Sequence, residues 1–407
     1  MPKQQLGLGG AIAIGLASML GAGVFVVFGS AYQISANLIF VSIAIAALVA
    51  GLNSAAIYQL ARQVDRPGGV YAYSRIYLSD TWSFLSGFAF VFGKIASIAA
   101  IALVVQQYVL PQIPFWPSVI AIALLTFINI LGINRTALVA TVLSITTIGF
   151  FLALTVMGTL NQSGLLEKAM MVQPSNPLQS VLIGASVVFF AFAGYARVAT
   201  LGDEVREAKR NIPKAIVISL SFVLVLYLVL AYVLLNDLGT LLTNGQTPVA
   251  DLANKVLGSN WIAPIVAAIA GLGSMLALLA GVSRTAASMA EDRELPQTFK
   301  LRNRFGSPWL AEVIIAVGAI ALTSAGKIVW VIGFSSFSVL FYYAVGHLTA
   351  IAQPKDQRVM PKWLNVLGIA LCLTLAISFG WETLSISTGI LGLAAAVRWL
   401  WQRSNSL

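Results

Sequence analysis

The chain has 407 residues, of which 59% are apolar and 9% are charged, and its mean hydropathy is +0.90. A soluble protein of this length needs a more charged surface, so the composition indicates a chain whose solvent is lipid. The net charge of +10 does not indicate nucleic-acid binding, because the basic residues lie in short loops between apolar runs. The single cysteine, Cys372, excludes an intrachain disulfide and argues against thiolate metal or redox chemistry.

Apolar runs of membrane-crossing length follow one another along the chain. In hydrocarbon every backbone polar group must be paired within its element, and such runs match helices that cross a core ~30 Å thick. We therefore predict an all-α polytopic membrane protein of about twelve transmembrane helices. The first apolar stretch is longer than the core of a signal peptide, so we expect it to be a retained helix. The predicted spans are 6–31, 37–60, 79–109, 116–133, 137–160, 178–200, 213–235, 260–289, 309–325, 328–351, 362–380 and 383–400.

The loops between these spans divide sharply by charge. Assigning alternate loops to one side gathers nineteen of the 24 basic residues there, whereas the opposite loops hold only Lys168, Lys255 and Lys327. Basic loops face the cytoplasm, so both termini are expected on the cytoplasmic side of the cell membrane. The asymmetry also favours an even number of spans, because one helix more or fewer would scatter the basic residues over both sides.

The order of the spans indicates two copies of one plan. Spans 3 and 8 are both unusually long, and spans 1 and 6 both carry small-residue interruptions. Spans 1–5 and 6–10 therefore form two repeats, and the odd number of helices inverts the second. Inverted repeats with a broken first helix are typical of secondary transporters whose substrate site lies at the midplane. We expect one transporter domain, 1–407, with a first repeat at 1–160, a second at 178–351 and peripheral helices 11 and 12 at 362–401.

The interruption in the first span contains Gly21 and Gly23, each of which lowers helix stability by ~1 kcal/mol relative to alanine. An unwound segment there exposes N–H groups at the start of the next half-helix, where they can hold a carboxylate. The alternative is that the glycines only allow close helix packing. In the sixth span, aromatic residues adjoin Ala193 and Gly194. An aromatic ring there can cover a ligand, or it can simply pack against lipid and neighbouring helices.

Lys94 lies near the centre of the third span, roughly 20 Å from water at 1.5 Å per residue, so it cannot reach water by extending its side chain. Intramembrane ionisable groups are costly and usually functional, which makes Lys94 the candidate proton carrier for coupling. The alternative is that it only braces the broken backbone of helix 1 or helix 8. We expect Arg197, near the inner end of span 6, to disfavour cationic substrates, and His347 to lie at the membrane interface.

Five motifs recur together in one family. They are GAGVF in span 1, PGGVYAYSR at 67–75, FFAFAGY at 189–195, DEVREAKRNIPKAI at 203–216 and SRTAASMAEDRELP at 283–296. With them, the chain resembles the amino acid permeases of the amino acid, polyamine and organocation (APC) superfamily, including the branch of cationic amino acid transporters. The resemblance runs from span 1 to about residue 310 and leaves neutral and cationic substrates open.

The resemblance implies a LeuT-like core of 5+5 inverted repeats with two peripheral helices, working by alternating access. It implies that Phe190 is a gating aromatic, and that Glu204 is either an inner gate or a structural tether of its loop. The family's functional lysine in helix 5 has no counterpart here, and Lys94 is the candidate to replace it from helix 3. By position, the implied substrate-binding residues are Met19, Gly21, Ala22, Gly23, Phe190, Ala191, Ala193 and Tyr195.

The function predicted from the sequence is secondary active transport of amino acids, by proton symport or exchange. The partners expected are an amino acid substrate, protons as a possible coupling ion and the lipid bilayer, without nucleic acid, metal or cofactor. The alternative is a sensor or subunit that binds amino acids without net transport. An enzyme is not expected, because the spans offer no paired carboxylates, histidine cluster or nucleophile beside a base.

Overall fold

The computed structural model describes residues 6–64, 68–131, 136–161, 163–199, 205–243, 245, 247–324 and 327–404. Within these ranges the fold is helical, and one isolated parallel bridge joins Leu6 to Val205. This confirms the all-α class. Seven helical segments are long and apolar enough to cross a membrane, and five shorter apolar helices accompany them. Together these helices lie close to the spans predicted from the sequence, which makes the chain a multi-pass membrane protein.

The first part of the chain forms eight α-helices. Their starts follow local sequence signals, as in the long helix from Asp80, where the Ser79 hydroxyl accepts a hydrogen bond from the Trp82 N–H at 3.4 Å. The helices are α1 (Leu8–Met19), α2 (Gly23–Ser35), α3 (Ile39–Ala61), α4 (Val70–Tyr77), α5 (Asp80–Val109), α6 (Trp116–Ile130), α7 (Thr136–Asn161) and α8 (Leu166–Met170), with the 3₁₀ helix η1 (Ala36–Leu38) between α2 and α3.

The second part begins with a helix that has Pro177 in its first turn and Asn176 as its cap, where the Asn176 side chain accepts from the Gln179 N–H at 3.4 Å. Its elements are α9 (Pro177–Phe192), η2 (Ala193–Tyr195), α10 (Ala196–Ala199), α11 (Ala208–Leu238), η3 (Gly239–Thr243), α12 (Pro248–Leu257), α13 (Ile262–Glu291), η4 (Gln297–Lys300), α14 (Trp309–Thr323), α15 (Ile328–Ala352), η5 (Lys355–Gln357), α16 (Lys362–Ser378) and α17 (Trp381–Ser404).

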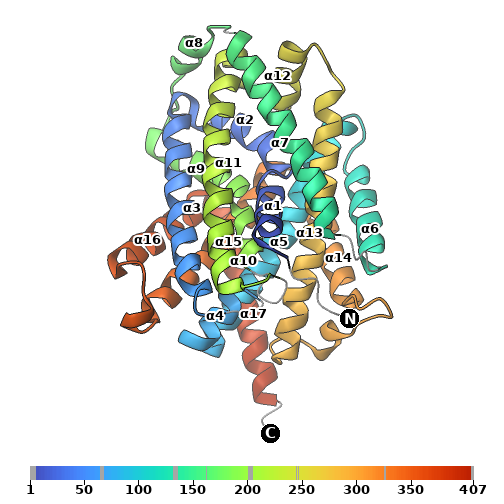
Figure 1. Ribbon diagram of the computed structural model, residues 1–407, viewed down its shortest axis with the longest axis vertical. Coiled ribbons are helices and arrows are strands. Elements are labelled where there is room, and N and C mark those ends of the chain that lie inside the picture. Colours follow the sequence, from blue (N-terminus) through green and yellow to red (C-terminus); the bar gives the residue numbers. More distant parts are fainter. Residues whose placement is uncertain are drawn as a thin grey trace.

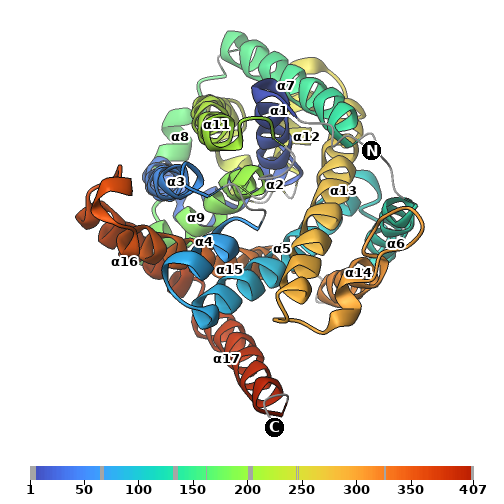
Figure 2. The same ribbon diagram turned by 60° about the horizontal axis from the view of Figure 1, so that its bottom comes forward.

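The long helices run roughly alongside one another, with α8 and α12 at one end of the molecule and α4 with the end of α17 at the other (Figure 1). We call these the α12 end and the α4 end. Helix α5 packs against α13 and α15, α1 against α11, and α2 and α3 against α9, so that the two interrupted helices lie inside the bundle. Helices α16 and α17 lie at its margin (Figure 2).

A buried ionic cluster fastens α17 to the α4 end. Arg398 on α17 binds Glu294 through two bonds, Nε to Oε2 at 2.5 Å and Nη2 to Oε1 at 3.0 Å, and both side chains are almost fully buried. Arg75 on α4 lies 3.6 Å from Glu294 and 3.5 Å from Asp292. The Tyr71 hydroxyl donates to Asp292 at 2.7 Å, and burial, with this hydrogen bond, raises the pKa of Tyr71 well above its usual range. We call Arg75, Asp292, Glu294 and Arg398 the ionic clamp.

The expectation that His347 lies at the membrane interface is wrong. The side chain is fully buried between α3, α15 and α16, with Nε2 2.9 Å from Asn53 Oδ1 and Nδ1 2.9 Å from Asn365 Oδ1. The thiol of Cys372 donates to the same Asn53 oxygen at 3.1 Å. Two asparagines on neighbouring helices therefore replace the water that an interfacial histidine would contact.

Candidate functional site

The first interruption separates α1 from α2 at Leu20, Gly21 and Ala22. The Leu20 N–H still donates to Leu16 at 2.8 Å, but the chain then bends, and Gly23 begins the next helix. This is the position at which the glycines predict a break. At the start of α2 the Val24 and Phe25 N–H groups donate to Gly21 O at 3.4 Å and to Ala22 O at 3.1 Å, and the aligned peptide dipoles of the helix leave a partial positive charge at this end.

The second interruption replaces α-helix by the 3₁₀ turn η2 between α9 and α10. Gly194 lies in this turn directly against the end of α1. A β-carbon at Gly194 would overlap backbone atoms of Ser18 and Met19. The two interruptions therefore touch through their main chains, which only glycine permits at this point.

A small cavity lies between the two interruptions. Its volume is about 30 Å³, enough for only one or two water molecules, so this conformation has no room for an amino acid. Among the described residues that line it, Lys94 is the one ionisable side chain. The lining residues are Ser18, Met19, Gly21, Gly23, Lys94, Ser97, Ile101, Phe190, Ala191, Gly194 and Leu278.

Of the substrate-binding residues expected from the sequence, Met19, Gly21, Gly23, Phe190 and Ala191 line this cavity. The phenyl ring of Phe190 covers the start of α2 so closely that a β-carbon at Gly23 would lie 3.1 Å from it. The Phe190 ring therefore lies over the start of α2.

Three of the expected residues point elsewhere. Ala22 faces Gly271 on α13, where an added β-carbon would lie 3.3 Å from that of Ala22. Ala193 contributes its carbonyl oxygen rather than its side chain, and the Tyr195 ring stacks on Tyr343 at 5.2 Å between centroids. Glu204 lies outside the described residues.

Lys94 is 4% exposed, and its Nζ donates to the carbonyl oxygen of Ala193 at 3.3 Å. The ammonium also lies 5.9 Å from the centre of the Phe90 ring. Lys94 thus contacts the broken backbone of α9, not that of the first or eighth predicted span. The Arg197 guanidinium packs closely against Gly281 of α13.

Five residues that line the cavity are not among the site residues expected from the sequence, namely Ser18 on α1, Ser97 and Ile101 on α5, Gly194 in η2 and Leu278 on α13. The Ser97 hydroxyl is 2.7 Å from that of Ser335 on α15. No sequence pattern singles out the two apolar residues, because which face of a uniformly apolar helix points inward depends on packing. Ser97 follows Lys94 by three residues, a spacing that places both side chains on one face of a helix and could have predicted it.

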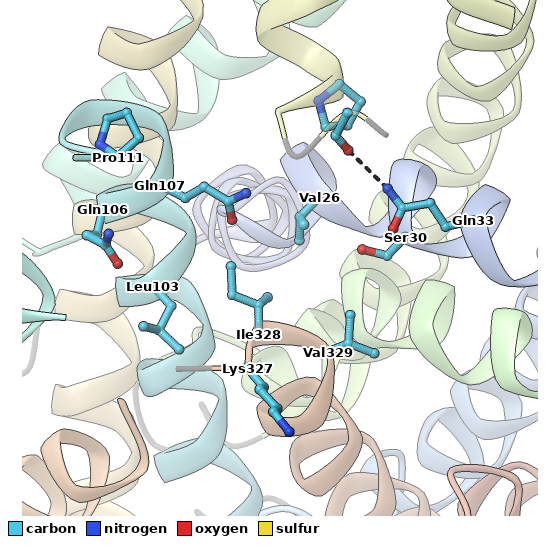
Figure 3. A pocket seen from close by; sticks show the side chains of 12 residues that line it. Val26, Ser30, Gln33, Leu103, Gln106, Gln107, Pro111, Lys327, Ile328 and Val329 are labelled. Atoms are coloured by element: carbon cyan, nitrogen blue, oxygen red, sulfur yellow. Dashed lines mark hydrogen bonds between the residues drawn. The ribbon is translucent and has the colours of Figure 1, made fainter. Parts of the chain in front are cut away.

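A larger cavity of about 390 Å³ lies beside the start of α12, and Figure 3 shows the side chains that line it. Val26, Gln107 and Ile328 point toward one another across it, and Gln33 donates through Nε2 to Gly245 at 3.0 Å. Lys327 is the one charged residue in the described part of its lining, which consists of Val26, Ser30, Gln33, Leu103, Gln106, Gln107, Pro111, Gly245, Pro248, Lys327, Ile328 and Val329.

Replacing Gly21 by alanine should weaken ligand binding through a clash that a second change removes. Gly21 has no positive φ, but its β-carbon would overlap Ser274 Oγ and lie 3.0 Å from Ser274 Cβ. Ligand-induced thermal stabilisation should fall in Gly21→Ala, and Gly21→Ala/Ser274→Gly should behave like Ser274→Gly alone. A double variant as impaired as Gly21→Ala would contradict this account of the contact.

Apolar helices of membrane-spanning length, two of them interrupted beside a small cavity, are typical of a membrane transporter. The chain belongs to the amino acid permease family of the APC superfamily, because the family profile described as "Amino acid permease" matches residues 6–394. The expected family is thereby confirmed.

The relatives are transporters with varied names. An uncharacterized transporter of Mycobacterium tuberculosis H37Rv is 36% identical over 400 residues, covering 97% of this chain and 90% of the relative. The branched-chain amino acid permease BcaP of Bacillus subtilis is 22% identical over 445 residues, covering 99% and 94%. The low-affinity putrescine importer PlaP of Escherichia coli K12 is 26% identical over 377 residues, covering 85% and 81%.

Proposed function

We propose that this chain is a secondary active transporter that carries amino acids across the cytoplasmic membrane by alternating access. The observation that carries the proposal is the contact between the two interruptions, where Gly194 lies on the backbone of Ser18 and Met19 beside a small cavity. Two half-helix ends that meet inside a bundle offer a substrate polar backbone groups without side-chain charge. The names of BcaP and PlaP support a small nitrogenous solute.

The finer architecture belongs to the same proposal. We infer twelve spans in a LeuT-like arrangement within one domain, with inverted repeats at 1–160 and 178–351, and with 362–401 peripheral. The equal lengths of α5 and α13, 30 residues each, support the repeat. The basic residues of the ionic clamp lie at the α4 end, which supports a cytoplasmic assignment of that end and of both termini.

In this proposal Met19, Gly21, Ala22, Gly23, Phe190, Ala191, Ala193 and Tyr195 form the substrate site, through side chains or backbone. Phe190 is its gate, and Glu204 is a second gating candidate. The small cavity volume of about 30 Å³ supports an alternating cycle, because the helices must separate before a substrate of amino acid size can enter.

Lys94 is the proposed coupling residue. Its ammonium binds a carbonyl of η2, so loss of its proton would weaken a contact that holds the interruption in its present shape. Proton binding and the conformation of the site are linked in this way. The hydrogen bond from Lys94 to Ala193 O would then both hold the break after α9 in its present shape and link that shape to proton binding.

Uptake of a radiolabelled amino acid panel into proteoliposomes tests transport. In sodium-free buffer, an inward proton gradient should drive accumulation by the unchanged protein. Lys94→Ala should abolish gradient-driven accumulation but retain exchange, whereas Lys168→Met, at an exposed position on α8, should behave as the unchanged protein. Full accumulation by Lys94→Ala would rule out its coupling role, and binding without any flux would identify a sensor or subunit instead.

A further inference from the structure

Three backbone acceptors at the two interruptions are already bonded to protein donors. Tyr227 on α11 donates through its hydroxyl to Met19 O at 2.6 Å and lies 3.4 Å from Ala191 O. Lys94 donates to Ala193 O at 3.3 Å. A substrate ammonium needs such carbonyl acceptors when it leaves water, because a buried charge without hydrogen bonds is strongly unfavourable.

Lys94 itself places an amine at the acceptor that a substrate amine would use. The side chain comes from α5, reaches the cavity and ends on the carbonyl of η2. A second ammonium in a cavity of about 30 Å³ would lie within a few ångströms of the first. Like charges that close repel strongly in a water-poor site, so a solute whose ammonium is not offset by a carboxylate of its own is disfavoured there.

The rest of the lining suits the opposite kind of group. The Lys94 amine is the charged donor of this lining, and the Ser97 hydroxyl beside it donates to Gly93 O at 3.1 Å. Ile101, Leu278 and Phe190 supply apolar surface around the amine. A carboxylate would pair with the Lys94 amine, and a short aliphatic chain would lie against the apolar wall.

We propose that Lys94 stands in for the substrate ammonium, so that this site selects small aliphatic carboxylates of net charge zero or minus one and rejects cations. Recognition then depends on the carboxylate, and an α-amino group is tolerated rather than required. The inference rests on the proposed function for the position of the site. It narrows the substrate class to one that differs from putrescine, the solute named for one relative.

Binding measurements on the purified protein test whether the site prefers carboxylates to amines. The probes are alanine, lactate as the same skeleton without the amine, ethylamine as the skeleton without the carboxylate, and putrescine, each assayed by ligand-induced thermal stabilisation. Alanine and lactate should bind within about tenfold of each other, and both amines at least roughly a hundredfold more weakly. Tight binding of either amine, binding of alanine without lactate, or no binding of any carboxylate would overturn the proposal.

Two variants of Lys94 distinguish an effect of its charge on binding from an effect of its side chain on folding. Lys94→Met keeps the length of the side chain and removes its charge, so lactate should bind at least about tenfold more weakly, while putrescine no longer meets repulsion. Lys94→Arg keeps the charge and should preserve the order of the four probes. Lys168→Met is the matched control at an exposed lysine and should leave every affinity unchanged. A Lys94→Met protein with the same preference as the unchanged protein would contradict the inference.

Flux measurements keep the two proposals apart. Tighter binding of the carboxylates than of the amines, without flux in proteoliposomes, would rule out transport. It would still support the proposed selection by charge. Flux of putrescine in preference to alanine and lactate would leave transport standing and overturn the charge selection. The two failures thus have different signatures.

Discussion

Gly194→Ala should reduce uptake at least about tenfold and leave the protein folded. The added methyl group meets main-chain atoms of Ser18 and Met19, which no change of rotamer can move aside. Overpacking of this kind costs about 1–3 kcal/mol, and here the strain falls on the contact between the two interruptions. Initial rates of uptake in proteoliposomes, normalised to the amount of inserted protein, measure the effect.

Gly392→Ala is the matched control, because nothing lies within 4 Å of the β-carbon that it would add on α17. It should transport as the unchanged protein does. If Gly194→Ala also transports at the unchanged rate, the close backbone contact does not govern the working cycle. An aggregated Gly194→Ala protein would instead indicate that the contact is needed for folding, which size-exclusion chromatography would reveal before any flux is measured.

Arg398→Met should strongly lower the thermal stability of the protein. It leaves Glu294, whose side chain is 2% exposed, with only the more distant Arg75 of the ionic clamp as a cationic partner. Removing one member of a buried ion pair costs about 3–5 kcal/mol, mainly because the other charge stays buried. The thermal unfolding midpoint of the detergent-purified protein should therefore fall clearly below that of the unchanged protein.

The double variant Arg398→Met/Glu294→Gln should recover part of this loss, because it removes the orphaned charge as well. Arg210→Met breaks a pair with Glu207 whose side chains are 68% and 56% exposed, and it should change stability by less than about 1 kcal/mol. Equal losses in Arg398→Met and Arg210→Met would show that burial of the ionic clamp contributes nothing.

The helical fold could be predicted from the sequence because the thickness of hydrocarbon sets the length of each apolar run. The interruption at Gly21 and Gly23 could also be predicted, since two glycines weaken a helix wherever its neighbours lie. The side chains that contact the interruptions could not be predicted. Tyr227 reaches Met19 across 208 residues of sequence, and only the rotation and packing of α11 bring its hydroxyl there.

The polar partners of His347 were missed for a related physical reason. Asn53 and Asn365 lie in apolar runs of other helices, and nothing local marks them as facing a histidine. Position along a helix predicts depth in the membrane, but depth alone does not distinguish a side chain in the headgroup region from one enclosed by three helices. The packing of α16 against α15 decides the matter.

The single hydroxyl of Tyr227 joins both interrupted helices, donating to Met19 and lying within reach of Ala191. A hydroxyl has one hydrogen, so a stronger bond to one carbonyl leaves a weaker bond to the other. Movement at either interruption therefore changes the energy of the other through one shared proton donor. Tyr227, held in position by α11, thus links the conformations of the two interrupted helices.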